Sequence, residues 1–153
     1  MEPISDAEAL DFLKHEMVAH VGVIDDGKPY VTPMSFALDG RRMFFRTKPG
    51  RRFEAIESNP TVCIEVSRFD ESSGDWVSVV VEGQAVERTD EATTTKAVEL
   101  LLEKYAPVLG SPLGTGGLQP MASFPHVVEV DIEQMTGMSS GRGFSFRTRP
   151  GRL

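Results

Sequence analysis

The sequence predicts a mainly β protein, an antiparallel barrel with added helices, and three observations favour this class. Short apolar segments follow one another with turn signals such as Asp26-Gly27 and Asp39-Gly40 between them. The segments with helical periodicity stand apart from these strands instead of alternating with them. A long strand carries Gly83 in its middle, where a barrel strand would bend. Consecutive hairpin-joined strands with helices set aside favour an antiparallel barrel over a parallel α/β sheet.

The N-terminal part is expected to form a helix and then three strands in hairpin order, over residues 5–16, 20–25, 29–38 and 42–46. Ser5 and Glu8 form a capping-box pattern at the start of the helix. Asp26-Gly27 is a strong signal for a two-residue hairpin turn. Pro33 interrupts the second strand. Because proline cannot donate to a strand ladder, we expect a bulge or a sheet edge at this position.

The rest of the chain is expected to form a short helix that ends at Asn59-Pro60, strands over residues 61–67, 76–88 and 127–135, and a helix after residue 90. Asp90 can cap this last helix. Residues 106–124 contain three prolines, four glycines and no charge, which predicts a long loop. We expect a single domain over residues 1–138 and an arginine-rich tail over residues 139–153.

Length and composition indicate a globular protein of 153 residues with 40% apolar and 25% charged residues. No apolar run approaches the roughly 20 residues that a membrane span needs. The N-terminus has no signal-peptide pattern, so we expect a cytoplasmic protein without a membrane partner. The single cysteine, Cys63, excludes an intrachain disulfide, and its place in a strand predicts a packed side chain. The three histidines are too scattered to indicate a metal site.

A basic turn is the most informative local feature of the chain. Six of its 16 Lys and Arg residues fall within residues 41–52, which contain no acid, although the net charge is -7. The overall charge argues against a nucleic-acid partner. Arg51 and Arg52 open the short helix after Gly50, where cations are unfavourable unless an anion lies between them. The pattern therefore indicates a phosphate site, with a solvated basic turn as the alternative.

Three segments together carry a resemblance: residues 22–36, residues 45–60 with Arg46-Thr47 and Gly50-Arg51-Arg52, and residues 76–83. They resemble the pyridoxamine 5'-phosphate oxidase-like, FMN-binding split-barrel superfamily, and most of all its small branch of nitroimidazole-resistance-type flavoproteins. The resemblance covers roughly residues 5–136. It implies a six-stranded antiparallel split β-barrel and a homodimer that holds FMN in the groove between its subunits.

The resemblance also implies which residues contact the cofactor. Arg46 and Thr47 would lie beside the FMN phosphate, and Arg51 and Arg52 would clamp it. Trp76 and Ser78 share a strand face and would approach the flavin ring or the partner subunit, although a tryptophan is more often a core or interface anchor. The residues expected to contact the flavin ring from the first strand pair are Pro33, Met34, Ser35 and Phe36.

The activity expected from the resemblance is that of an FMN-dependent oxidoreductase or flavin reductase, passing a hydride between NAD(P)H and an acceptor. The flavin carries this chemistry, so no catalytic side chain is assigned. True vitamin B6 oxidases have a lysine where Arg52 stands and a longer basic turn, which argues against activity on pyridoxamine phosphate. Two alternatives remain: a reductase dependent on the deazaflavin F420, whose anionic tail would suit the C-terminal arginines, and a non-catalytic flavin- or haem-binding module.

Overall fold

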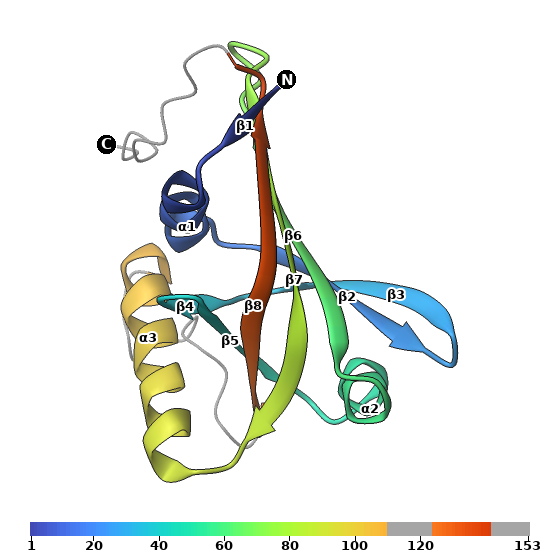
Figure 1. Ribbon diagram of the computed structural model, residues 1–153. Coiled ribbons are helices and arrows are strands. Elements are labelled where there is room, and N and C mark those ends of the chain that lie inside the picture. Colours follow the sequence, from blue (N-terminus) through green and yellow to red (C-terminus); the bar gives the residue numbers. More distant parts are fainter. Residues whose placement is uncertain (110–123, 142–153) are drawn as a thin grey trace.

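The computed structural model describes residues 1–109 and 124–141, which form one antiparallel sheet and three helices (Figure 1). The helices are α1 (Asp6–His15), α2 (Arg51–Ser58) and α3 (Glu91–Leu109). The strands are β1 (Glu2–Ile4), β2 (Ala19–Asp25), β3 (Lys28–Met34), β4 (Ala37–Asp39), β5 (Arg42–Thr47), β6 (Thr61–Phe69), β7 (Trp76–Arg88) and β8 (His126–Ser139).

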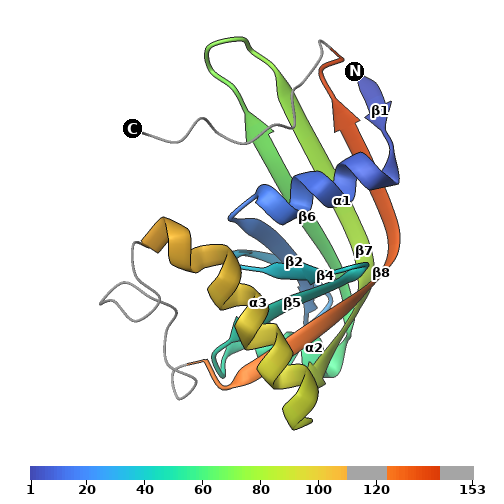
Figure 2. The same ribbon diagram turned by 90° about the vertical axis from the view of Figure 1, so that its left-hand side faces the viewer.

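The sheet has eight strands in the order β3-β2-β6-β7-β8-β5-β4, with β1 paired to β8, and β3 and β4 at its two edges. Every pairing is antiparallel, and the sheet curls without closing. Helices α1 and α3 lie across the same side of the sheet, while α2 lies at one end of it (Figures 1 and 2). The predicted fold class, a mainly β split barrel with added helices, is confirmed. The six longer strands correspond to the predicted ones, the short strand β1 is additional, and β4 begins within the predicted strand over residues 29–38.

Local sequence signals explain how the N-terminal elements begin and turn. The Glu8 N–H donates to the Ser5 hydroxyl at 3.3 Å, and the Ser5 N–H donates back to the Glu8 carboxylate at 2.8 Å, so the capping box is formed. Asp26 and Gly27 both have positive φ, at 50° and 75°, as the predicted hairpin turn requires. Pro33 lies in the edge strand β3, as predicted.

The predicted strand over residues 29–38 is wrong as a single element. The chain leaves the ladder at Ser35 and Phe36 and resumes as β4, on the opposite edge of the sheet. Gly83 marks the predicted bend, because the β7 to β8 register shifts there. A Cβ at this position would overlap the carbonyl oxygen of Asp131, so only glycine allows the approach.

The main core fills the space between the sheet and α1. Its largest fully buried side chains include Phe12, Leu13, Met43, Phe45 and Ile64. The outer face of β6 has no such cover, and Cys63 on that face is exposed. The prediction of a packed cysteine was therefore wrong, even though the alternation of strand faces was right.

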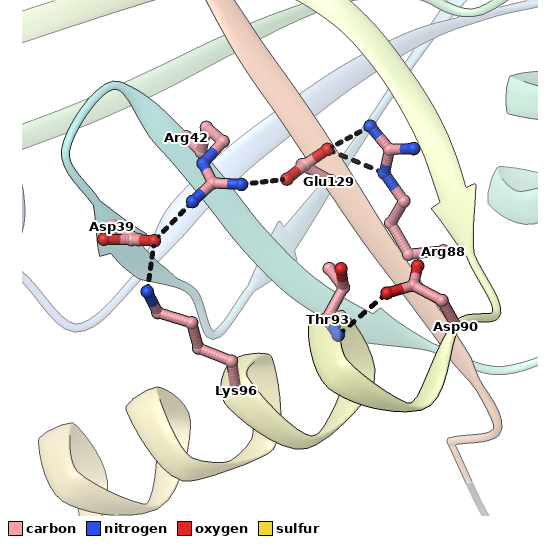
Figure 3. Close-up of polar contacts among 7 residues, drawn as sticks. All are labelled: Asp39, Arg42, Arg88, Asp90, Thr93, Lys96 and Glu129. Atoms are coloured by element: carbon pink, nitrogen blue, oxygen red, sulfur yellow. Dashed lines mark hydrogen bonds and ion pairs between the residues drawn. The ribbon is translucent and has the colours of Figure 1, made fainter.

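Charged side chains hold α3 against the β4–β5 edge of the sheet, the edge opposite to β3 (Figure 3). The carboxylate of Glu129, which is buried, accepts from Arg42 at 3.3 Å and from Arg88 at 2.6 Å. Asp39 joins Arg42 to Lys96 of α3, at 2.6 and 2.9 Å. These ion pairs connect β4, β5, β7 and β8 to the helix.

The C-terminal elements are longer than predicted. Asp90 caps α3 through the Thr93 N–H at 2.9 Å, as expected, but the helix continues to Leu109 with Pro107 inside it. The first four residues of the predicted loop are therefore helical, because the apolar face of α3 stays packed on the sheet through Tyr105. Residues 110–123 of that loop, and the C-terminal arginines at 142, 147, 149 and 152, lie outside the described residues, whereas Phe124 is described. Within the described part of the chain, no helix is long and apolar enough to cross a membrane.

Candidate functional site

A cavity of about 280 Å³ lies where β3, β5, α2 and α3 meet, and it brings together five of the ten predicted site residues. Two of these five are arginines from the basic turn, and three come from the end of β3 and the residue after it. Its lining residues are Pro33, Met34, Ser35, Arg46, Arg52, Leu101 and Phe124.

Arg52 reaches the cavity from the first turn of α2, where two threonine hydroxyls hold its guanidinium group. Its Nη1 donates to the hydroxyl of Thr32, and its Nε and Nη2 donate to the hydroxyl of Thr47 at 3.3 and 3.1 Å. Within residues 1–109 and 124–141, Arg52 forms no ion pair with a carboxylate. Burial lowers the pKa of this guanidinium, since it disfavours the charged form. The group is thus a fixed cation that lacks an acidic partner.

Arg46 brings a second cation to the same cavity, and this one is buried. Its side chain extends from β5, and the residue is only 8% exposed. Its Nε donates to the carbonyl oxygen of Phe124 at 3.3 Å, and its guanidinium lies 5.9 Å from the centre of the Phe124 ring. Burial lowers the pKa of Arg46 as well. Two guanidinium groups, one buried and one half-buried, thus line one cavity, where an anion placed between them would be favourable.

The start of α2 adds to the positive potential. Gly50 is its N-cap, with φ at +150°, and provides no side-chain hydrogen bond to the first turn. No acidic residue precedes Glu54 in the helix. The phenyl ring of Phe53 stacks on His126 of β8 at 3.7 Å, and His126 pairs with Glu87 at 2.8 Å, so α2 is fixed on the sheet. The helix that carries Arg52 is therefore a rigid support.

Two further residues of the predicted phosphate site lie near the cavity without lining it. Thr47 is buried, and its hydroxyl accepts both hydrogen bonds from Arg52, so it orients that side chain. Arg51 is more than half exposed. It pairs with Asp25 at 2.5 Å and lies over the ring of Tyr30 at 3.9 Å. Its cation is already partnered at the tip of the β2–β3 hairpin.

Phe36 is also separate from the cavity lining. The side chain is fully buried, and the backbone N–H donates to the hydroxyl of Tyr105 at 3.0 Å. The wall of the cavity thus ends at Ser35, one residue earlier than predicted.

Trp76 and Ser78 lie in the first part of β7, where they pair with Phe69 and Ser67 at the end of β6. Helix α2 lies at the other end of β6, just before Thr61. The Ser78 hydroxyl donates to Glu65 at 3.1 Å, and Glu65 also pairs with His20 at 3.2 Å. Glu65 and His20 border a separate hollow of about 550 Å³ on the outer face of the sheet. Within one subunit, the structure does not bring Trp76 and Ser78 to the arginine cavity.

Sequence reasoning missed Thr32, Leu101 and Phe124. Leu101 belongs to the apolar stripe of α3 and gives no sign that it faces a cavity. Phe124 comes from the end of the predicted loop, and no local pattern distinguishes it. Thr32 sits on a strand next to Pro33, and only its contact with Arg52 reveals its role. Within the described ranges, no group of three His, Cys, Asp or Glu side chains is placed to hold a metal ion.

Comparison with known proteins agrees with this geometry. Residues 5–139 match the family model of pyridoxamine 5'-phosphate oxidase. The chain belongs to the pyridoxamine 5'-phosphate oxidase family. An uncharacterized protein of Rhizobium meliloti (strain 1021), RA0666, is 30% identical over 139 residues, which cover 82% of this chain and 86% of the relative. The resemblance stated from the sequence is thereby confirmed.

Solved structures with the same fold include members from other bacteria. An FAD-binding protein from Mesorhizobium loti superposes with a TM-score of 0.72 and 24% identity, over 91% of this chain and 97% of the other. A protein from Bacteroides thetaiotaomicron, provisionally assigned to 5-nitroimidazole antibiotic resistance, superposes with a TM-score of 0.69 and 20% identity, over 89% and 85% of the two chains. At these identities, the two structures establish the fold that the family shares.

Proposed function

We propose that this member of the pyridoxamine 5'-phosphate oxidase family binds FMN as a homodimer and works as a flavin-dependent oxidoreductase in the cytoplasm. The observation that carries the proposal is the pair of guanidinium groups on one cavity, from Arg46, which is buried, and Arg52, which is half-buried. Arg46 is buried, and Arg52 forms no ion pair with a carboxylate within residues 1–109 and 124–141. A phosphate dianion is the kind of ligand that offsets the cost of holding two such cations on one cavity.

The donor set fits a phosphate group. Thr32 and Thr47 fix the orientation of the Arg52 guanidinium plane. This reduces the conformational entropy that is lost when the remaining N–H donors of Arg52 bind an anion. Charge-assisted hydrogen bonds of this kind contribute about 1.5–3 kcal/mol each. The uncapped first turn of α2 adds backbone donors and a favourable dipole close to Arg52.

The remainder of the cofactor would lie along the β3 wall. Met34 and Ser35 can offer backbone and side-chain groups to the polar edge of the ring, while Leu101 and Phe124 provide apolar contact. When bound, the flavin would supply hydride transfer between NAD(P)H and an acceptor, and the chain would bind the cofactor, orient it and exclude water.

The homodimer belongs to the proposal because the cavity of one subunit contains only part of the predicted contacts. Trp76 and Ser78 lie at the other end of the sheet in their own subunit. Their contact with the flavin ring would therefore come from the partner subunit, across the groove where the cofactor lies.

The first test is titration of the purified protein with FMN, FAD and F420, followed by flavin fluorescence and visible absorption. We expect FMN to bind and an Arg52→Glu variant to lose it, because a carboxylate would then face Arg46 in place of a cation. FAD is included because the Mesorhizobium loti structure is that of an FAD-binding protein. Wild-type protein that binds none of the three would contradict the proposal, and normal FMN binding by the variant would contradict the phosphate site.

The second test addresses catalysis. FMN-loaded protein should oxidise NADH or NADPH in the presence of a quinone or nitroaromatic acceptor. Flavin binding without turnover across such acceptors would favour the alternative of a non-catalytic binding module. Preferential binding of F420 would keep the fold and the phosphate site, and would change the hydride carrier.

A further inference from the structure

The hydroxyl of Tyr105 joins three segments that are distant in the sequence. Tyr105 belongs to α3 and is only 7% exposed. Its Oη accepts a hydrogen bond from the Phe36 N–H at 3.0 Å and donates one to the carbonyl oxygen of Met17 at 2.6 Å. Phe36 lies 69 residues away along the chain, and Met17 lies 88 residues away. One side-chain oxygen thus connects α3 to the β3–β4 connection and to the α1–β2 connection.

The β3–β4 connection is the place where the cavity wall leaves the sheet. Met34 is the last residue of β3, and the chain rejoins the sheet at Ala37. Between them, Ser35 lines the cavity and Phe36 is fully buried. A buried backbone N–H without a partner is costly. Tyr105 supplies the partner that the strand ladder does not.

Two neighbours of Tyr105 on α3 act on the same region. The ammonium group of Lys104 lies 3.6 Å from the centre of the Phe36 ring and donates to the carbonyl oxygen of Leu13 at 3.3 Å. Leu101, one turn earlier, lines the cavity itself. The same stretch of α3 therefore forms one wall of the cavity and fixes the end of the second wall, which β3 and Ser35 form.

We propose that Tyr105 is a positioning residue for the cofactor cavity. Its hydroxyl sets the path of the chain from Pro33 to Ser35, and thereby the spacing between this wall and the two arginines. The inference rests on the proposed flavin binding, and it adds a residue that does not line the cavity. A tyrosine that served only to fill the core would act through its ring, which a phenylalanine reproduces.

The test is a Tyr105→Phe variant, which removes the hydroxyl and keeps the ring. We expect the Kd for FMN to rise about tenfold. In the FMN-free protein, we expect the amide resonances of Met34, Ser35 and Phe36 to shift in ¹⁵N–¹H spectra. The matched control is Val66→Ala, in the buried core of β6, which lowers stability without touching the cavity wall. This control should leave the Kd for FMN within about twofold of the wild type.

The outcomes separate the possible failures. An unchanged Kd for FMN in Tyr105→Phe, or an equal loss of affinity in Val66→Ala, would overturn the positioning role. A wild-type protein that binds no flavin would overturn the proposed function and the ligand part of this inference together. In that case the amide resonances decide the remainder. A shift that reaches Met34 and Ser35, beyond the Phe36 N–H that loses its acceptor, supports Tyr105 as the residue that sets the wall. Unchanged resonances of Met34 and Ser35 overturn that role.

Discussion

Arg52 directs two of its nitrogens, Nε and Nη2, at the single hydroxyl of Thr47, at 3.3 and 3.1 Å. A guanidinium group has a fixed planar shape, so this fork fixes the orientation of the whole group. The third contact, from Nη1 to the Thr32 hydroxyl, completes the hydrogen bonds that orient the guanidinium group. Thr47 therefore orients a guanidinium group of the cavity without itself lining the cavity.

The first prediction follows from this contact. A Thr47→Val variant keeps the shape of the buried side chain and removes the oxygen that orients Arg52. We expect the Kd for FMN to rise roughly three- to tenfold, because the loss of the two hydrogen bonds that orient Arg52 reaches the anion only indirectly, and so costs less than the about 1.5–3 kcal/mol of a direct hydrogen bond to a charged group. Isothermal titration calorimetry measures the Kd for FMN, and the control is Thr61→Val at the exposed start of β6. Equal affinities for the two variants would show that Thr47 does not orient the cation.

A second prediction separates two adjacent arginines of the same type. Arg52→Gln and Arg51→Gln each remove one positive charge from the same helical turn. We expect the first to weaken FMN binding at least tenfold, because Arg52 lines the cavity without an acidic partner. The second should change affinity less than threefold, because Arg51 is exposed and paired with Asp25. Equal losses would restore the original expectation that both arginines clamp the phosphate.

These arginines show how far the sequence could lead. The acid-free run and the helix entrance predicted a phosphate site, and the structure places two of the arginines of this run, Arg46 and Arg52, on one cavity. Which of Arg51 and Arg52 reaches the cavity depends on how α2 is rotated on the sheet, and that is set by Phe53 and His126, a pair that only the fold brings together.

The strand pattern of the sequence also predicted features of the sheet correctly. Pro33 predicted the sheet edge, and the alternation of residues in β6 predicted which side chains are buried. The break at Ser35 and Phe36 was missed because its stabilising partner, Tyr105, comes from α3. The alternation of residues in β6 does not show whether a second layer covers the outer face of the strand. Cys63 lies exposed on that face, and the expectation of a packed side chain therefore failed.

A third prediction concerns the ion pairs of Figure 3. Glu129 is a buried carboxylate between Arg42 and Arg88, both of which are partly exposed. A Glu129→Gln variant keeps the size of the side chain and leaves two cations without their shared anion. We expect the free energy of unfolding to fall by about 1–3 kcal/mol, less than for a fully buried pair because solvent screens the arginines.

Urea denaturation measures this loss, and the control is Glu133→Gln, which removes the same charge from an exposed position on the same strand. That control should stay within about 0.5 kcal/mol of the wild type. A Glu129→Gln variant as stable as this control would mean that the network contributes nothing to holding α3.

The fourth prediction is a pH dependence of stability that originates at Lys104. Burial lowers the pKa of this amine from 10.5 to about 8, while the charge of Glu16 opposes the shift. Between these two pH values the unfolded chain binds a proton that the folded chain does not. The contribution of Lys104 therefore makes the protein more stable as pH rises from about 8 to 10.5. Burial also raises the pKa of Tyr105, so that hydroxyl stays neutral through most of this window.

The comparison is between the wild type and Lys104→Met, which keeps an unbranched apolar chain over the Phe36 ring and cannot be protonated. At pH 7 the wild type carries the desolvation cost of the ammonium group, at most about 3 kcal/mol for a shift of this size. In urea titrations, we expect the free energy of unfolding of the wild type, relative to the variant, to change little from pH 7 to 8 and to increase from about pH 8 to 10. If the difference in the free energy of unfolding between the two proteins stays constant, the amine is as well solvated in the folded protein as in the unfolded chain. Helix α3 would then pack more loosely over Phe36 than the 3.6 Å contact indicates.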